Sequence, residues 1–184
     1  MARLVGAQVL GLYQLIMPAY AVIQSICISG LAVSISVLSS EFHARKNELA
    51  LRQLMSTGLR GLVVLWLPVA LTVLFQSDFI ARRLLGDSRT QLGLVLLLPV
   101  LLLTGVENLQ KHQFYGIGAM RLPAGVELGE QILRSVAIVV LLLVLAPEQE
   151  ERSVGLIVIG LLISEVFSST ALTWSCLLYT SRCV

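Results

Sequence analysis

Long apolar runs separated by short polar connections make up most of the chain. A helix that spans the bilayer needs about 20 mostly apolar residues. Runs of suitable length predict five spans, near residues 8–39, 58–75, 90–106, 123–146 and 153–174. Internal prolines, among them Pro18, Pro68 and Pro99, are tolerated in such helices because neighbouring helices satisfy the freed carbonyl groups. We expect a kink at Pro18. The pattern predicts an all-α, polytopic membrane bundle of about five transmembrane helices.

The composition supports a membrane protein and excludes several other classes. Apolar residues make up 57% of the 184 residues and charged residues 13%, whereas a soluble domain carries about 25% charged residues. Mean hydropathy is +0.88, so too little polar surface remains for a soluble enzyme. A net charge of +2 is too weak and dispersed for nucleic-acid binding. The cysteines and histidines lack metal-site spacing, and no nucleotide or nucleophile motif occurs, so we expect no cofactor, no metal and no enzyme activity.

The Lys and Arg residues of the polar connections predict an orientation. Connections one and three contain six, namely Arg45, Lys46, Arg52, Arg60, Lys111 and Arg121, while connections two and four contain four, namely Arg82, Arg83, Arg89 and Arg152. Cytoplasmic connections carry the excess of Lys and Arg. Connections one and three are therefore expected on the cytoplasmic side.

The fourth predicted span carries charges inside its apolar sequence. Its uninterrupted apolar stretch, residues 135–146, is too short to cross a bilayer, so the helix must include Glu127, Glu130 and Arg134. Offsets of three and four residues place these side chains on one helical face, and Glu130 precedes Arg134 in the order that favours an ion pair. Two interpretations stay open: the stripe lines a watery cavity, or it forms a structural pair in the headgroup zone.

Glu165 stands inside the last apolar run, with no other charge near it on its own helix. An unpaired carboxylate near the middle of a bilayer is costly. Three interpretations stay open: Glu165 is protonated, binds a cation, or pairs with a basic residue such as Arg134 from the neighbouring helix. Small residues also recur along the first span, at Ser25, Ser29, Gly30, Ser34 and Ser36, a spacing typical of close helix packing or of a polar cavity lining.

Two groups of segments resemble one family. Residues 11–18, 29–32 and 39–41 resemble the second helix of the stage V sporulation protein B group, and residues 114–118, 122–124 and 130–134 resemble later parts of it. These proteins are polysaccharide-biosynthesis-type members of the multidrug/oligosaccharidyl-lipid/polysaccharide exporter superfamily. The resemblance covers most of residues 6–170. It places Glu130 and Arg134 in the family's Glu-Gln-x-x-Arg pattern, which favours a position facing the cavity.

The resemblance implies a MATE-like transporter of two helical lobes around a central cavity, in the bacterial plasma membrane. Residues 1–175 would supply part of the N-terminal lobe, without its first helix or the second lobe. The residues from Cys176 to Val184 resemble a translated sequencing adapter and are expected to be a non-native tail, although an ordinary interfacial anchor at Tyr179 and Arg182 is the alternative.

The function implied is a flippase for lipid-linked oligosaccharide or polysaccharide precursors, working by alternating access without ATP. Its expected partners are the lipid bilayer, a lipid-linked sugar, and a coupling cation or proton. Glu127, Glu130, Arg134 and Glu165 are the candidate cavity residues. The alternatives are a multidrug or cation antiporter of the same superfamily, and a non-transporting membrane scaffold in sporulation.

Overall fold

The computed structural model describes residues 7–84, 90–145 and 150–182, and all the regular elements in these ranges are helical. The elements are α2 (Ala7–Gln24), the π-helical segment η1 (Ser25–Ser29), α3 (Gly30–Ala44), α4 (Glu48–Phe79), the π-helical segment η2 (Ile80–Leu84), α5 (Thr90–Gly116), α6 (Arg121–Leu145) and α7 (Glu150–Arg182). The prediction of an all-α bundle is confirmed.

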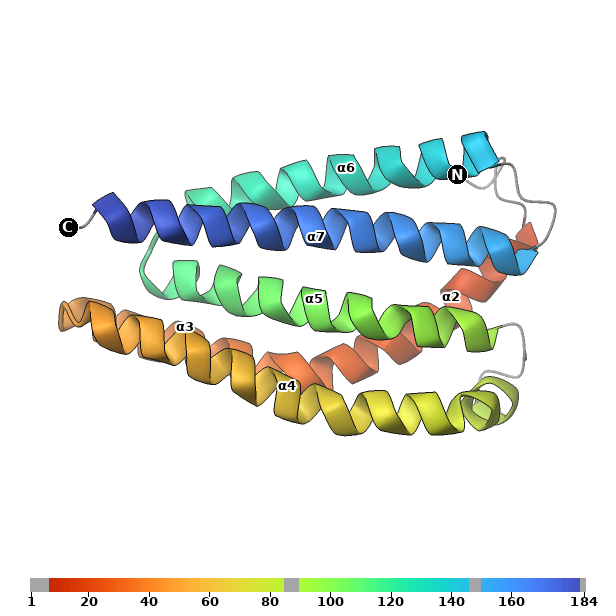
Figure 1. Ribbon diagram of the computed structural model, residues 1–184, viewed down its shortest axis with the longest axis horizontal. Coiled ribbons are helices and arrows are strands. Elements are labelled where there is room, and N and C mark those ends of the chain that lie inside the picture. The colour runs from red at the N-terminus through yellow and green to blue at the C-terminus, as the bar shows by residue number, and fades with distance from the viewer. Residues whose placement is uncertain (1–6, 85–89, 146–149, 183–184) are drawn as a thin grey trace.

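Four described helical segments are long and apolar enough to cross a membrane: Ile16–Ala44, Glu48–Arg83, Gly93–Gly116 and Gly155–Cys176. The chain is therefore a multi-pass membrane protein in contact with lipid. Helix α6, which carries Glu127, Glu130 and Arg134, is not among these four segments. It has 25 residues and lies alongside α7 (Figure 1). A fifth span at α6 stays a prediction.

The helices extend beyond the apolar runs that predicted them. Helix α4 begins at Glu48, well before residue 58, and α5 continues past residue 106 to Gly116. An apolar run marks the part of a helix that lies in hydrocarbon, whereas polar residues continue the same helix into the headgroup zone or into protein. Helix α7 runs to Arg182, into the segment predicted as a tail, whose last residues, 183–184, lie outside the described residues.

Helix α5 lies at the centre of the bundle. It packs against α7 on one side and against α3 and α4 on the other, while α6 packs mainly on α7 (Figure 1). The central helices are also the most buried. In the apolar stretches of α5 and α7, 61% and 56% are buried, against 22% in each of the two other candidate spans. Because α5 and α7 are enclosed by protein, polar side chains on their facing surfaces are shielded from lipid.

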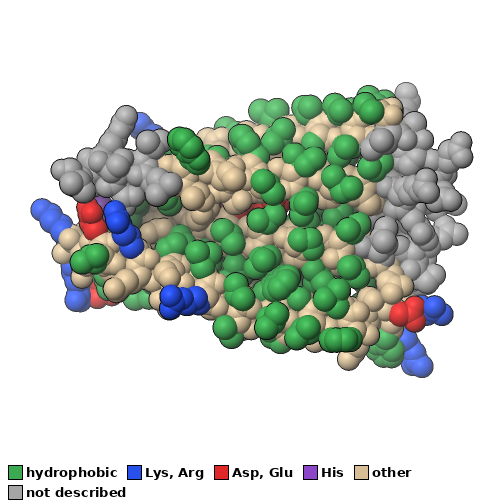
Figure 2. Space-filling view, in the orientation of Figure 1, with side chains coloured by type: hydrophobic (Ala, Val, Ile, Leu, Met, Phe, Trp, Pro, Cys, Tyr) green, Lys and Arg blue, Asp and Glu red, His purple; other side chains and the backbone are tan. Residues whose placement is uncertain are grey.

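The outer surface has the distribution expected for a protein in a bilayer. Figure 2 shows apolar side chains over the middle of one face and charged side chains at its two ends. Exposed apolar residues such as Val64, Leu67 and Phe75 lie on α4. The exposed ion pair of Arg45 with Glu41 lies at the turn between α3 and α4. An apolar belt between polar ends matches a hydrocarbon layer between two headgroup zones.

Glycines allow three pairs of helices to approach closely. A Cβ atom on Gly116 of α5 would lie 2.7 Å from the Cβ of Ser39 on α3 and would collide with the backbone carbonyl of Ser36. On α5, Gly105 faces Leu62 of α4, and Gly160 of α7 faces Ile138 of α6. Small residues at helix contacts permit close packing in membranes.

The predicted stripe of small residues in the first span does not pack within the chain. Ser25, Ser29, Gly30 and Ser34 are exposed in the structure, and a Cβ atom on Gly30 would meet nothing within 4 Å. The described part of the chain therefore shows no close packing at these four positions, and packing against helices outside this chain stays a prediction. A kink was expected at Pro18, but Pro18 lies inside the regular helix α2. The irregular π-helical segment η1 begins at Ser25, seven residues later in the sequence.

The ends of the helices alternate as the sequence predicts. The α3–α4 turn and the α5–α6 turn lie at one end of the bundle, and the end of α4 and the start of α5 lie at the other (Figure 1). Lys111 does not belong to a connection, because it lies inside α5 with only 13% of its side chain exposed. Of the other counted residues, Arg89 lies outside the described residues, and nothing is described of the Arg152 side chain. The cytoplasmic placement of connections one and three stays a prediction.

Candidate functional site

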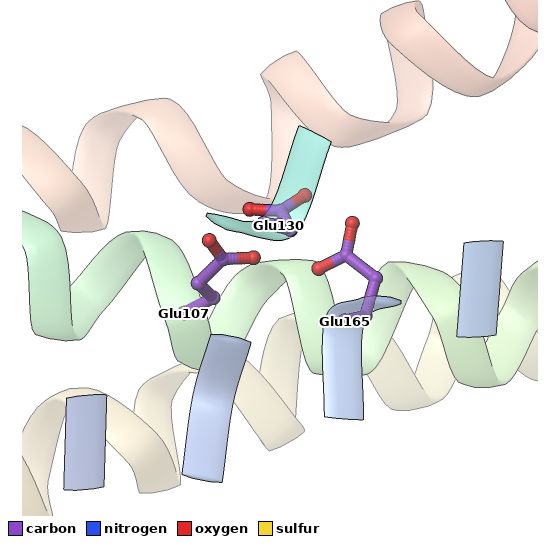
Figure 3. A group of neighbouring side chains, drawn as sticks. All are labelled: Glu107, Glu130 and Glu165. Carbon is purple, nitrogen blue, oxygen red and sulfur yellow. The ribbon is translucent and has the colours of Figure 1, made fainter. Parts of the chain in front are cut away.

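Three glutamates from three different helices meet inside the bundle. Glu107 of α5, Glu130 of α6 and Glu165 of α7 are 2%, 3% and 5% exposed. They point toward one another in Figure 3, and one carboxylate oxygen from each lies within 4.8 Å of the other two. Carboxylates are rarely this buried unless they are paired, because the bilayer interior solvates charge poorly.

Two basic residues lie among these carboxylates. Lys111 Nζ lies 2.6 Å from Glu107 Oε1 and 3.6 Å from Glu130 Oε2. Arg134 Nη2 forms an ion pair with Glu130 Oε1 and lies 3.1 Å from Glu165 Oε1. We call these five residues the buried charge network. It joins α5 to α6 through Lys111, and α6 to α7 through Arg134.

Hydroxyl groups supply further hydrogen bonds around the network. Ser168 Oγ of α7 donates to Glu107 Oε1 at 2.6 Å, which adds a link between α7 and α5. Arg134 Nε donates to Ser164 Oγ at 3.2 Å. Farther along α5, Thr104 is hydrogen-bonded to Tyr20 of α2 through their hydroxyl groups, 2.9 Å apart. The polar interior therefore reaches from α6 to α2.

The structure brings together three of the four residues singled out from the sequence. The Glu130–Arg134 ion pair is present, and Glu165 pairs with Arg134, one of its three predicted alternatives. Glu127 is exposed and lies outside the network. A three-residue offset on an α-helix leaves two side chains about 60° apart in direction, and this places Glu127 beyond the face that packs on α7. Glu127 thus takes no part in the ion pairs of the network, and its place in a stripe that lines a cavity stays a prediction.

Glu107 and Lys111 were missed as site residues. The predicted third span ended at residue 106, which assigned both to a connection rather than to the buried helix. A signal was present, since Glu107 precedes Lys111 by four residues, the same favourable order as Glu130 and Arg134. Two such pairs on neighbouring apolar segments mark both helices as carriers of buried charge.

The donor set determines which ligands the network can hold. Three carboxylates at this spacing could bridge a cation. Lys111 and Arg134 already contact all three of them, and they occupy at least one oxygen of each. Only one carboxylate oxygen in the network, Glu165 Oε2, is both buried and without a hydrogen-bond partner in the described part of the chain. The buried interior of the network suits the binding of a small positive charge, whereas an anion could meet the network at the partly exposed side chain of Arg134.

A comparison with curated proteins finds a similarity to Stage V sporulation protein B of Bacillus subtilis (strain 168), at 28% identity over 133 residues. The match covers 72% of this chain and 26% of that protein, so the chain spans about a quarter of the length of this relative. No family model matches the sequence, and no solved structure matches it. The chain is thus a multi-pass membrane protein with a distant similarity to a sporulation protein, in agreement with the resemblance drawn from its motifs.

Proposed function

We propose that this chain forms part of one lobe of a membrane transporter, and that the complete transporter moves lipid-linked oligosaccharide or polysaccharide precursors across the cell membrane. The observation that carries the proposal is the similarity to Stage V sporulation protein B over 72% of the chain, because the group it resembles is associated with this cargo. The apolar bundle with charge at its centre supports it. The transporter works by alternating access, without ATP.

Arg134 is the residue of the network best placed to meet cargo. Its side chain is 25% exposed, whereas that of Lys111 is 13% exposed and those of the glutamates are less so. A guanidinium group donates several hydrogen bonds and binds phosphate oxygens in pairs. Glu130, Glu165 and Ser164 hold this group from within. In the proposal, its exposed part contacts the phosphate that links lipid to sugar.

The test is translocation of a fluorescent lipid-linked sugar in proteoliposomes that contain the full-length protein of which this chain is part. The variants are Arg134→Gln, Arg134→Lys and the control Arg121→Gln, an exposed arginine at the start of the same helix. Arg134→Gln should slow translocation about tenfold or more, since it removes charge-assisted hydrogen bonds. Arg134→Lys should be intermediate and Arg121→Gln unchanged. If the full-length protein moves no lipid-linked sugar under any ion gradient, the proposed cargo is wrong.

A second candidate is a non-transporting membrane scaffold in sporulation. The pairing of each of the five charged residues inside the chain favours it, because such a network can serve assembly alone. If the protein is a scaffold, spore assembly should be normal in Arg134→Lys and in variants that do not translocate lipid-linked sugar, as long as the variant protein folds and still binds its partners. Normal spore assembly by a variant that folds but does not translocate would favour the scaffold.

A further inference from the structure

The buried charge network does not balance when all its members are ionised. Glu107, Glu130 and Glu165 bring three negative charges, and Lys111 and Arg134 bring two positive ones. Two other ionisable groups lie near the network: Tyr20 of α2, a phenol bonded to Thr104, and Glu127 of α6, an exposed carboxylate that acts on Lys111. Neither brings a positive charge at neutral pH. One uncompensated negative charge would remain among helices that cross the membrane, and such a charge is costly.

An orphaned oxygen shows where the compensating charge belongs. Glu165 is 5% exposed, and its Oε1 atom accepts a hydrogen bond from Arg134 at 3.1 Å. Its Oε2 atom is buried and has no hydrogen-bond partner among the residues that the structure describes. The Glu165 side chain points toward Glu107 and Glu130 (Figure 3). The neighbouring carboxylates are acceptors, so they cannot donate a hydrogen bond to this oxygen. A proton on Oε2 would make Oε2 a hydrogen-bond donor to one of them.

We propose that Glu165, together with Glu107 and Glu130, forms a proton-binding site that holds one proton at neutral pH on Glu165 Oε2. The Glu165 carboxylate takes a proton from hydronium in the solvent: an O–H bond forms at Oε2, an O–H bond of hydronium breaks to leave water, and the carboxyl group becomes neutral. The O–H group then donates to a carboxylate of Glu107 or Glu130, while Oε1 still accepts from Arg134. This site does not depend on the proposed transport function.

A metal ion fits these residues less well than a proton. Calcium and magnesium bind about six oxygen ligands, whereas Lys111 and Arg134 already contact oxygens of all three carboxylates. A divalent ion would also leave the network with a net positive charge. A proton balances the charge, needs no further ligand, and satisfies the orphaned oxygen.

Loss of the proton has a structural consequence. Glu107, Glu130 and Glu165 lie on α5, α6 and α7 respectively, so removal of the proton sets three carboxylates against one another across the contacts of these helices. Repulsion between buried like charges weakens the packing that brings them together. Protonation of Glu165 therefore stabilises the packing of α6 and α7 on α5.

The test is infrared spectroscopy of the purified full chain in detergent, with sodium-free and sodium-containing buffers at neutral pH. A protonated carboxyl group has a carbonyl band separate from that of ionised carboxylates. We expect this band in the unaltered protein and in the control Glu127→Gln, which alters an exposed glutamate of α6. The band should disappear in Glu165→Gln. Because glutamine imitates the neutral carboxyl group, this variant should fold with a melting temperature close to that of the unaltered protein.

Two results would overturn the proposal. One is the absence of the carboxyl band from the unaltered protein at neutral pH. If the band is absent and sodium raises the melting temperature of the unaltered protein but not that of Glu165→Gln, the site binds a metal cation instead of a proton. The other is a band that persists in a folded Glu165→Gln variant, which would place the proton elsewhere. Should Glu165→Gln fail to fold, Glu107→Gln and Glu130→Gln would be compared. Each leaves two carboxylates with two cations, so the proposal requires that the band weakens or disappears in both folded variants, and a band of full strength in either would overturn it.

Discussion

Arg134 of α6 donates a hydrogen bond from Nη2 to Oε1 of Glu165 on α7, at 3.1 Å. The same nitrogen pairs with Glu130 on its own helix. A single guanidinium group therefore joins two buried carboxylates from two helices. This contact explains how α6, which carries charge in the middle of its sequence, packs along α7: its charged face is turned toward a partner that can pair with it.

Loss of Lys111 should destabilise the protein more than loss of its partner does. Lys111→Met leaves Glu107 buried without its nearest cation, at a cost on the order of 3 kcal/mol. Glu107→Gln should cost less, since Lys111 keeps Glu130 at 3.6 Å. The double variant should be more stable than the sum of the two single changes predicts. Thermal unfolding in detergent measures all three, and strict additivity would contradict the pairing.

Gly116→Ala should destabilise the contact between α5 and α3. The new Cβ atom would lie 2.7 Å from the Cβ of Ser39 and would strike the Ser36 backbone, and overpacking of this kind costs about 1–3 kcal/mol. The matched control is Gly125→Ala on α6, where a Cβ atom meets nothing within 4 Å. Alanine favours a helix over glycine, so the control should be neutral or slightly stabilising. Equal unfolding temperatures for both variants would show that this close approach is absent.

The two ends of the bundle should label from opposite sides of the membrane. In a protein from which the cysteines have been replaced, Lys46→Cys lies at the α3–α4 turn and Arg83→Cys lies in η2. The excess of Lys and Arg predicts that Lys46→Cys is cytoplasmic. An impermeant maleimide should therefore label Arg83→Cys on intact cells, and Lys46→Cys only after permeabilisation. The reverse pattern would invert the predicted orientation.

The fold was largely predictable because crossing a bilayer imposes a requirement that a sequence shows directly. Each span needs a continuous apolar run, and four such segments occur in the described chain. The ends of the helices were not predictable in this way, since nothing in an apolar run shows that α5 continues to Gly116. Tertiary pairing with other helices keeps the polar end of α5 helical and buried.

The site was predictable only where its partners lie on one helix. The spacing of Glu130 and Arg134 predicts their ion pair, and the same spacing at Glu107 and Lys111 carries an equal signal. The convergence of the two pairs does not follow from spacing, because it depends on how α5, α6 and α7 pack. Ser168 is the clearest case: a serine in the run Ser168-Ser169-Thr170 shows no sign of its bond to Glu107, 61 positions away.

The most direct test of the buried charge network is a double-mutant cycle between Arg134 and Glu165. Arg134→Met, Glu165→Ala and the double variant are compared by thermal unfolding in detergent, with Arg121→Ala and Glu127→Ala as an exposed control pair on α6. A charge-assisted hydrogen bond between helices predicts a coupling free energy of about 1–2 kcal/mol, and the control pair should show none. Additive effects at Arg134 and Glu165 would contradict the account, because the contact that joins α6 to α7 through charge would not exist.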